Sequence, residues 1–195
     1  IFTTQNNFVN IYVCGVTTYD KPHIGHAMSY IIFDTLHRYL EHKGFLVNRI
    51  QNFTDIDDKI IDKANKDSID SIEVSEKNIS AYFDVMDRLN IIRANHYPRA
   101  TNEIEEIKEI ISILIDKGFA YESGGSVYFS VKKYEGYGKL SGRNVEDMLE
   151  ATRFDLDDNK FFFADFVLWK SSKPGEPFWE SPWGIGRPGW HIECS

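Results

Sequence analysis

A strand, a loop, a helix and a second strand follow one another near the start of the chain, and this order constrains the fold more than any other feature. Residues 8–13 alternate between apolar and polar types, which predicts a strand. Apolar residues then recur every three or four positions from Ile24 to Gly44, which predicts a helix with a glycine at its carboxyl end. A second strand at 45–50 completes a βαβ unit, so we expect a parallel sheet in a Rossmann-like α/β fold.

Three more helices are predicted after this unit. The first is expected to have Thr54 or Asp55 as its cap, with acidic residues in its first turn. The second covers residues 75–89. The third has Thr101 as its cap and ends at Gly118.

From residue 119 to residue 166 the pattern changes to short strand-like pieces at 127–129 and 161–163, separated by glycines and charged residues. This pattern of short, interrupted strand-like pieces indicates an inserted α+β connective module. The expected division is the first half of a Rossmann-like catalytic domain at 1–102, the connective module at 103–187, and the start of the second half of the catalytic domain at 188–195.

The chain has 22 basic and 30 acidic residues and a formal net charge of -8. This balance is opposite to that of a protein that binds nucleic-acid backbone over a broad surface, so any RNA contact is expected to be local. Cys14 and Cys194 are the only cysteines, and no apolar run of signal or membrane length precedes them, which predicts a reducing cytoplasm and disfavours a disulfide. Because the chain begins without methionine and stops at Ser195 without a helix-ending or loop signal, we expect a partial chain.

The loop between the first strand and the first helix is the place where an open α/β sheet binds ligands. Cys14 and Gly15 are expected to end the strand, a turn is expected at 16–22, and His23-Ile24-Gly25-His26 follows it. Gly25 would let a phosphate approach the backbone, and the two imidazoles would donate hydrogen bonds to oxygens that gain charge during attack at phosphorus. The sequence contains no G-x-x-x-x-G-K-[ST] segment, so a P-loop does not supply the phosphate site.

Cys14 lies nine residues before His23 at the end of the predicted strand. Strand position and spacing alone favour a small buried residue there. Cys194 lies 180 residues further along the chain, which is too far for the local ligand spacing of a zinc ribbon. Spacing therefore does not pair the two thiols as metal ligands.

The motifs of this chain resemble, in order, those of the cysteinyl-tRNA synthetases, a family of class I aminoacyl-tRNA synthetases. The resemblance is to the N-terminal part of these enzymes and covers nearly the whole chain, and the ordered set is very specific. The first motifs are Cys14-Gly15-Val16-Thr17-Thr18-Tyr19-Asp20, His23-Ile24-Gly25-His26 and Asn52-Phe53-Thr54-Asp55-Ile56-Asp57-Asp58-Lys59. The later motifs are Pro98-Arg99-Ala100-Thr101, Tyr137-Gly138-Lys139-Leu140-Ser141, Asp165-Phe166-Val167-Leu168-Trp169-Lys170 and the run from Ser181 to Ser195, which ends Gly186-Arg187-Pro188-Gly189-Trp190-His191-Ile192-Glu193-Cys194-Ser195.

The resemblance implies a cysteine-tRNA ligase. Such an enzyme activates L-cysteine with ATP and Mg²⁺ to cysteinyl-adenylate, releases diphosphate, and transfers cysteine to the 3′ end of the cysteine tRNA. It is expected to be a cytoplasmic monomer without membrane attachment. The resemblance implies that His23 and His26 are catalytic. It also implies that ATP is bound by Gly15, Thr17, His23, Gly25 and His26, and that cysteine is bound by Cys14, Gly15, Thr54 and Trp190.

The resemblance also implies one zinc ion per subunit. Cys14 and Cys194 match two of its four ligands, and a histidine and a glutamate beyond residue 195 are expected as the others. Such a site suits a cysteine-specific enzyme, because the substrate thiolate can bind the metal and a serine hydroxyl cannot do so comparably. A lysine-serine loop that contacts ATP and a helical anticodon-binding domain are likewise expected after residue 195.

Two alternatives stay open beside the tRNA ligase. One is the related ligase that joins activated cysteine to an amino sugar in thiol biosynthesis, and the other is a non-catalytic module that binds zinc or nucleotide. The sequence Asp57-Asp58-Lys59-Ile60-Ile61 favours the tRNA enzyme, because the sugar ligases typically have proline and leucines after the paired acids. Asp55, Asp57 and Asp58 are expected either to cap a helix or to contact substrate.

Three segments depart from the family pattern. Val16 stands where the family usually has proline, Lys21-Pro22 replaces a small or aromatic pair before the first histidine, and Phe161 to Ala164 is more apolar than usual. The Val16 departure removes no reactive group, Pro22 is expected to stiffen the entry to the helix, and the apolar segment is expected to pack differently.

Overall fold

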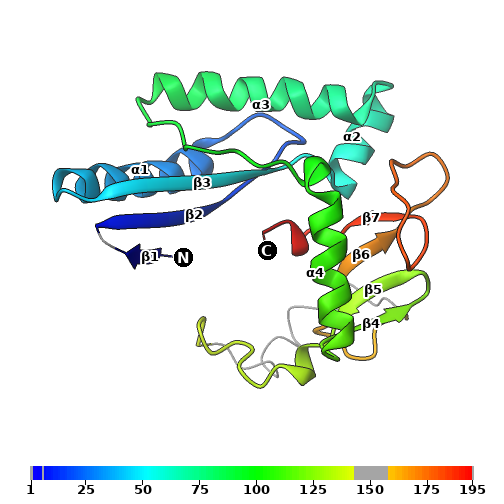
Figure 1. Ribbon diagram of the computed structural model, residues 1–195. Helices are drawn as coiled ribbons and strands as arrows, with labels where there is room; N and C mark the ends of the chain where they lie inside the picture. The colour runs from blue at the N-terminus through cyan, green and yellow to red at the C-terminus, as the bar shows by residue number, and fades with distance from the viewer. Residues whose placement is uncertain (1, 6, 143–157, 195) are drawn as a thin grey trace. The chain divides into compact units, whose positions relative to one another are not determined.

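The computed structural model describes residues 2–5, 7–142 and 158–194, and these form two compact units (Figure 1). The first unit contains Ile1–Glu103 together with Cys194, and the second contains Ile104–Glu193 and Ser195. In the described part of the chain, no helix has the length and apolar character that crossing a membrane requires. The predicted division of the catalytic domain at 102 and 187 stays a prediction.

The first unit is built on a three-stranded sheet in the order β1-β2-β3. Strand β1 (Phe2–Gln5) pairs antiparallel with β2 (Phe8–Thr17), and β2 pairs parallel with β3 (Leu46–Thr54). Helix α1 (Ile24–His42) connects the two parallel strands, and Gly44 follows it with a φ of 86°. The predicted βαβ unit and its parallel sheet are therefore confirmed.

Both parallel strands are longer than predicted. Strand β2 does not end at Cys14; it continues to Thr17 through an irregular register between Val13 and Val16. Strand β3 continues to Thr54, and its last residues, from Gln51 onward, are buried. The sequence predicted loops there because these residues are polar or lack alternation, whereas in the structure they form the carboxyl ends of the two strands, and the end of β3 is buried.

Helices α2 (Asp58–Asp67) and α3 (Ser71–Arg88) follow β3. The predicted cap of the first of these, Thr54 or Asp55, is wrong. Asp57 is the cap, and its Oδ1 accepts a hydrogen bond from the Lys59 amide at 2.9 Å. Helix α3 begins four residues earlier than predicted because Asp70 caps it, accepting from the Ile72 amide at 2.7 Å.

In the core of the first unit, helices α1 and α3 both pack against the sheet. Val9, Ile11 and Val13 of β2 and Phe53 of β3 pack with side chains of α1 and α3. The Tyr82 ring of α3 lies edge-on to the rings of both Tyr30 and Phe53. In Figure 1 α3 runs alongside β3, and the contact between Tyr30 and Tyr82 joins α1 to α3.

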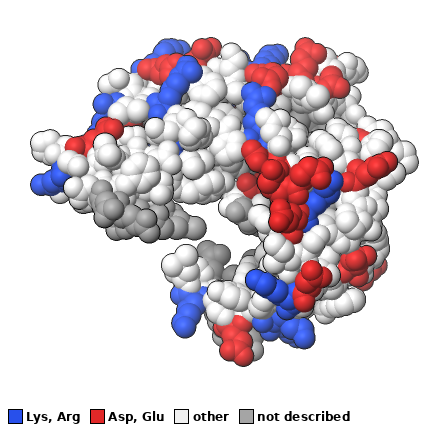
Figure 2. Space-filling view, in the orientation of Figure 1, with Lys and Arg blue, Asp and Glu red and all other residues white. Residues whose placement is uncertain are grey.

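The second unit is an α+β module. Helix α4 (Ile104–Asp116) precedes a four-stranded antiparallel sheet of β4 (Ala120–Ser123), β5 (Ser126–Phe129), β6 (Phe166–Ser171) and β7 (Gly186–Pro188). A short 3₁₀ turn at Val131–Lys133 lies in this unit, another at Ala100–Asn102 lies in the first unit, and a third, Ile192–Cys194, ends with the residue that is grouped with the first unit. Figure 2 shows acidic side chains gathered over the first turns of α4, where Glu105, Glu106 and Glu109 are exposed.

Two predictions for this region are wrong. Residues 161–163 form bends and a turn instead of a strand, and the strand lies at β6. The Phe161 amide donates to the Tyr121 hydroxyl, and the Phe161 ring stacks on Tyr121 at 4.1 Å, so side-chain contacts replace strand pairing there. Thr101 does not cap α4, because its amide and its hydroxyl both donate to the carboxylate of Asp55.

Candidate active site

The carboxyl ends of β2 and β3 approach each other most closely at Gly15. A Cβ atom on this residue would lie 1.5 Å from the carbonyl oxygen of Asn52. The Gly15 amide donates to the Asn52 side-chain oxygen at 2.7 Å, which holds the irregular part of β2 against β3. Any residue other than glycine would push the two strands apart at the place where open α/β sheets bind ligands.

His23 and His26 form the amino-terminal cap of α1. Each side chain accepts a hydrogen bond from a backbone amide at the start of the helix. The Nδ1 atom of His23 accepts from the Gly25 amide at 3.1 Å, and the Nδ1 atom of His26 accepts from the His23 amide at 3.2 Å. The rings stack with their centroids 3.9 Å apart. This reciprocal arrangement is a capping box in which imidazoles take the places of the usual hydroxyl and carboxylate.

The cap also determines which nitrogen of each ring can donate. Because both Nδ1 atoms accept hydrogen bonds, the neutral form of each imidazole carries its proton on Nε2. The pKa of His26 is lowered, first by burial and then by the neighbouring charge of His23. The pair therefore favours a neutral His26 and offers two Nε2–H donors beside the helix N-terminus, where anions bind favourably.

Gly25 is required by its contact with His23. A Cβ atom at Gly25 would lie 2.9 Å from Cε1 and 3.0 Å from Nδ1 of the His23 ring. The ring thus packs directly over the Gly25 backbone. The sequence explained this glycine by the approach of a phosphate, whereas the structure also shows that it allows the imidazole cap.

The two thiols lie next to each other despite their separation in the chain. The sulfur of Cys14 is 3.2 Å from the sulfur of Cys194, and both residues are exposed. Cys194 ends the last 3₁₀ turn and is grouped with the first unit. The expected proximity of the two cysteines is confirmed, although spacing alone did not predict it.

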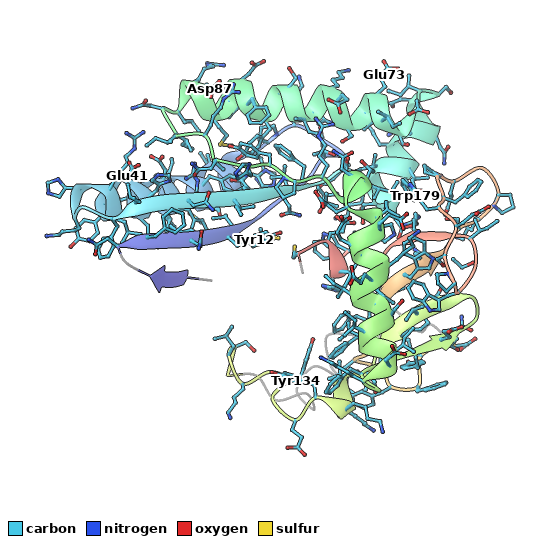
Figure 3. All side chains as sticks on the ribbon, in the orientation of Figure 1. Tyr12, Glu41, Glu73, Asp87, Tyr134 and Trp179 are labelled. Carbon is cyan, nitrogen blue, oxygen red and sulfur yellow. The ribbon has the colours of Figure 1, made fainter. Side chains whose placement is uncertain are left out.

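Cys194 has further polar neighbours on β2 and β3. Its pKa is raised, first by the hydrogen bond with Cys14 and then by burial, while hydrogen bonds with Tyr12 and Asn52 oppose the shift. Tyr12 is labelled on β2 in Figure 3. The Tyr30 hydroxyl of α1 donates to the Cys14 carbonyl oxygen at 3.3 Å. Sequence reasoning missed Tyr12, Tyr30 and Asn52, because no local pattern distinguishes them from ordinary strand and helix residues.

No group of three or more His, Cys, Asp or Glu side chains in the described ranges, 2–5, 7–142 and 158–194, is arranged to hold a metal ion. Cys14 and Cys194 place two sulfur atoms 3.2 Å apart, and their role as zinc ligands stays a prediction. Two thiolates at one position are the ligand type that zinc and other soft metals prefer.

Thr17 and Thr54 are register partners at the ends of β2 and β3. Thr54 is buried, and its carbonyl oxygen accepts from the amide of Thr18 at 3.1 Å and from the hydroxyl of Thr18 at 3.2 Å. Thr17 is half-buried. Their predicted contacts with ATP and cysteine stay predictions, and Thr18 is a neighbour that sequence reasoning did not single out.

Hydrogen bonds give Asp55 and Asp57, in the acidic run after β3, structural roles. Asp55 accepts from the Thr101 amide at 3.0 Å and from the Thr101 hydroxyl at 2.6 Å, and Asp57 caps α2. Asp58 lies in the first turn of α2, where a negative charge is favourable. The helix-cap alternative is thus correct for Asp57, while Asp55 binds Thr101 within a 3₁₀ turn.

Trp190 belongs to the second unit, where 55% of its surface is exposed and its ring lies 5.3 Å from the His191 ring. Burial, followed by the charge of Lys160, lowers the pKa of His191. The role of Trp190 in a cysteine pocket stays a prediction.

Comparison with known proteins gives a consistent result. Residues 1–195 match the family described as tRNA synthetases class I (C) catalytic domain. The chain is 58% identical to a cysteine-tRNA ligase of Dehalococcoides mccartyi over 98% of this chain and 42% of that protein. It is 54% identical to a cysteine-tRNA ligase of Syntrophobacter fumaroxidans over 96% of this chain and 38% of that protein. The chain thus spans about two fifths of the length of these relatives.

The fold is also similar to a solved structure, the Mycobacterium tuberculosis methionyl-tRNA synthetase in complex with methionyl-adenylate. The TM-score is 0.67 and the sequence identity is 15%, over 95% of this chain and 45% of that chain. At this identity the likeness concerns the fold alone. It agrees with the predicted Rossmann-like α/β class.

Proposed function

The chain belongs to the class I (C) catalytic-domain family of tRNA synthetases, and on that premise we propose that it carries the cysteine-activating part of a cysteine-tRNA ligase. The observation that carries this proposal is the contact of two thiols, those of Cys194 and of Cys14, near the end of the strand that leads to the imidazole-capped helix. One arrangement thus offers soft ligands for a metal that would bind the substrate thiolate, and hydrogen-bond donors for phosphate.

In the proposed reaction, the carboxylate of L-cysteine attacks the α-phosphorus of ATP, so that cysteinyl-adenylate forms and diphosphate leaves. His23 and His26 donate from Nε2 to phosphate oxygens, whose negative charge rises in the transition state. Gly15 and Gly25 keep side chains out of the space beside the backbone, and Thr17 completes the ATP contacts. Mg²⁺ accompanies ATP as the substrate complex.

The cysteine pair fits the zinc ion that the family implies. Two thiolates bound about 2.3 Å from a tetrahedral zinc are about 3.8 Å apart. The sulfurs of Cys14 and Cys194 are 3.2 Å apart, so a movement of a few tenths of an ångström at each residue would accommodate the metal. When bound, zinc would supply a position for the thiolate of substrate cysteine, and we propose a histidine and a glutamate beyond residue 195 as its remaining ligands.

The proposed partners are L-cysteine, ATP and the cysteine tRNA, with Thr54 and Trp190 lining the cysteine pocket. Residues 1–102 would form the first half of the catalytic domain, 103–187 the connective module and 188–195 the start of the second half. The acidic net charge of -8 supports a small local tRNA contact on this chain. We further propose a cytoplasmic monomer without membrane attachment.

The test is cysteine-dependent exchange of diphosphate into ATP by the full-length zinc-loaded protein. We expect exchange with L-cysteine and at least a thousandfold less with L-serine, because a hydroxyl does not replace the thiolate at the metal. Wild-type protein without any cysteine-dependent exchange would contradict the proposal. The isolated 195 residues are expected to exchange weakly or not at all.

The acceptor is tested separately by supplying cysteine tRNA or an amino sugar to the activated enzyme. Transfer of labelled cysteine to the tRNA supports the ligase proposed here, and transfer to the sugar alone would support the amino-sugar ligase. The comparisons do not favour that alternative, since the relatives named above are cysteine-tRNA ligases.

A further inference from the structure

Thr18 is the last buried residue before the loop that leads to the imidazole pair. It is 1% exposed and directly follows β2. The next three residues, Tyr19, Asp20 and Lys21, are all exposed, and Pro22 is half-buried. The path of the chain from the strand end to His23 is therefore held at its start by Thr18.

The amide, the hydroxyl and the carbonyl oxygen of Thr18 each have a hydrogen-bond partner on β3 or α3. Its amide and its hydroxyl meet the Thr54 carbonyl oxygen, and its hydroxyl lies 2.6 Å from the Ser75 hydroxyl. Each hydroxyl has one proton to donate. The assignment that satisfies all groups has Ser75 donating to Thr18 and Thr18 donating to Thr54.

Helix α3 supplies a second contact to the same residue. The Asn78 side-chain amide donates to the Thr18 carbonyl oxygen at 3.0 Å and to the Val74 carbonyl oxygen at 3.0 Å. Ser75 and Asn78 are three positions apart and therefore lie on the same face of α3. Both are buried, so the cluster is shielded from competing water.

We propose that Thr18, Ser75 and Asn78 form a positioning cluster for the reaction. The cluster ties the end of β2, the end of β3 and helix α3 together at one residue. It thereby sets where Thr17 lies and where the loop to His23 begins. The three side chains act through the ATP-binding residues and have no direct contact with substrate, and this role rests on the proposed adenylate-forming function.

The sequence carries no sign of this role, because each of the three residues has an ordinary alternative explanation. A threonine after a strand, and a serine and an asparagine inside a helix, are commonly surface residues. Their joint burial and their continuous hydrogen bonds distinguish them from that background.

The test uses the full-length protein with Thr18→Val, which keeps the shape and removes the hydroxyl, and Thr18→Ser, which keeps the hydroxyl. In diphosphate exchange we expect Thr18→Val to lower kcat at least tenfold with less than a threefold change in KM for ATP. Thr18→Ser should recover most of kcat. Such a split is expected if the hydroxyl aligns groups that act mainly in the transition state.

Asn48→Ala is the matched control. Asn48 donates to the Asn10 side chain at 3.0 Å and thus joins the same two strands near their amino ends, away from the site. This variant should retain wild-type kcat. Hydrogen exchange measured by mass spectrometry provides a readout that does not need activity, and we expect faster exchange of residues 17–26 in Thr18→Val and not in Asn48→Ala.

The outcomes separate this inference from the proposed function. Wild-type exchange of diphosphate with an unchanged kcat in Thr18→Val would overturn the positioning role alone. A wild-type protein without activity would overturn the function. In that case unchanged hydrogen exchange in Thr18→Val would overturn the positioning cluster as well, and faster exchange confined to residues 17–26 would support it.

Discussion

Replacement of Gly15 by alanine tests the closest approach in the site. The new Cβ would lie 1.5 Å from the Asn52 carbonyl oxygen and 2.6 Å from its carbonyl carbon, and both are backbone atoms that cannot rotate away. The strands must separate by about 1.5 Å to restore a contact of about 3.0 Å, which is the shortest that real Cβ atoms tolerate. A movement of that size breaks the Gly15–Asn52 hydrogen bond of 2.7 Å.

The expected loss of stability in Gly15→Ala has two parts, the steric clash of the new Cβ atom and the loss of the Gly15–Asn52 hydrogen bond. Forcing a methyl group into a packed interior costs about 1–3 kcal/mol, and the lost hydrogen bond costs about 1 kcal/mol. The expected decrease in the free energy of unfolding is therefore about 2–4 kcal/mol. For a domain of this size the decrease corresponds to a fall in Tm of about 4–16 °C.

Thermal and urea unfolding of the wild type and of Gly15→Ala measure this decrease. Gly44→Ala is the control, because Gly44 has a φ of 86° and a Cβ atom added there would meet no other atom within 4 Å. That variant should lose only about 1 kcal/mol from backbone strain. A Gly15→Ala protein within about 0.5 kcal/mol of wild type would refute the steric argument, and a loss no larger than that of Gly44→Ala would show that the contact with Asn52 costs less than expected.

Three further predictions concern the neighbours of this site. Gly25→Ala should displace the His23 ring and lower the diphosphate exchange rate at least tenfold, while stability changes by less than about 1 kcal/mol because alanine favours the helix. The pKa of His26 is lowered from 6.5, so the unfolded chain binds a proton that the folded state disfavours, and the free energy of unfolding should fall as pH decreases below about 6.5. His26→Gln should make this decrease smaller. A pH profile of stability identical to that of the wild type would contradict this prediction. Thr101→Val removes a 2.6 Å hydrogen bond to the Asp55 carboxylate and should cost about 1.5–3 kcal/mol in urea unfolding, whereas Thr101→Ser should cost less.

The elements that the sequence predicted well are those whose pattern reflects burial on one face. Helix α1 begins at Ile24 as predicted, and the parallel pairing of β2 with β3 follows from the crossover rule. The strand ends were predicted poorly. Polar residues such as Gln51 and Asn52 suggest a loop, but they are buried there because the Tyr82 hydroxyl and the Gly15 amide satisfy them.

The caps show a second limit of local reasoning. Asp55 and Asp57 are two residues apart in the same acidic run, so the sequence offers both as a cap for α2. Only the position of Thr101, 46 residues later, separates their roles, because its amide and hydroxyl bind Asp55 and leave Asp57 to cap the helix. A partner that distant is fixed by tertiary structure, and no local rule identifies it.

The pairing of Cys14 with Cys194 has a consequence for the proposed zinc site that can be measured. Zinc binds the thiolate, so each bound cysteine must release its proton. The hydrogen bond with Cys14 raises the pKa of Cys194, which places the whole range from pH 6 to pH 8 below that pKa. Loss of the Cys194 proton alone should therefore increase the apparent zinc affinity of the full-length protein about tenfold for each pH unit.

Competition with a chromogenic chelator at pH 6, 7 and 8 measures this slope. Cys194→Ser should bind zinc more weakly, and its zinc affinity should rise about tenfold less per pH unit than that of the wild type. Asn48→Ala should retain both the affinity and its dependence on pH. A wild-type affinity that does not change with pH would contradict binding of zinc by these two thiols. An unchanged slope in Cys194→Ser would remove Cys194 from the ligand set, because a cysteine that binds zinc releases its proton to the solvent and thereby contributes to the slope.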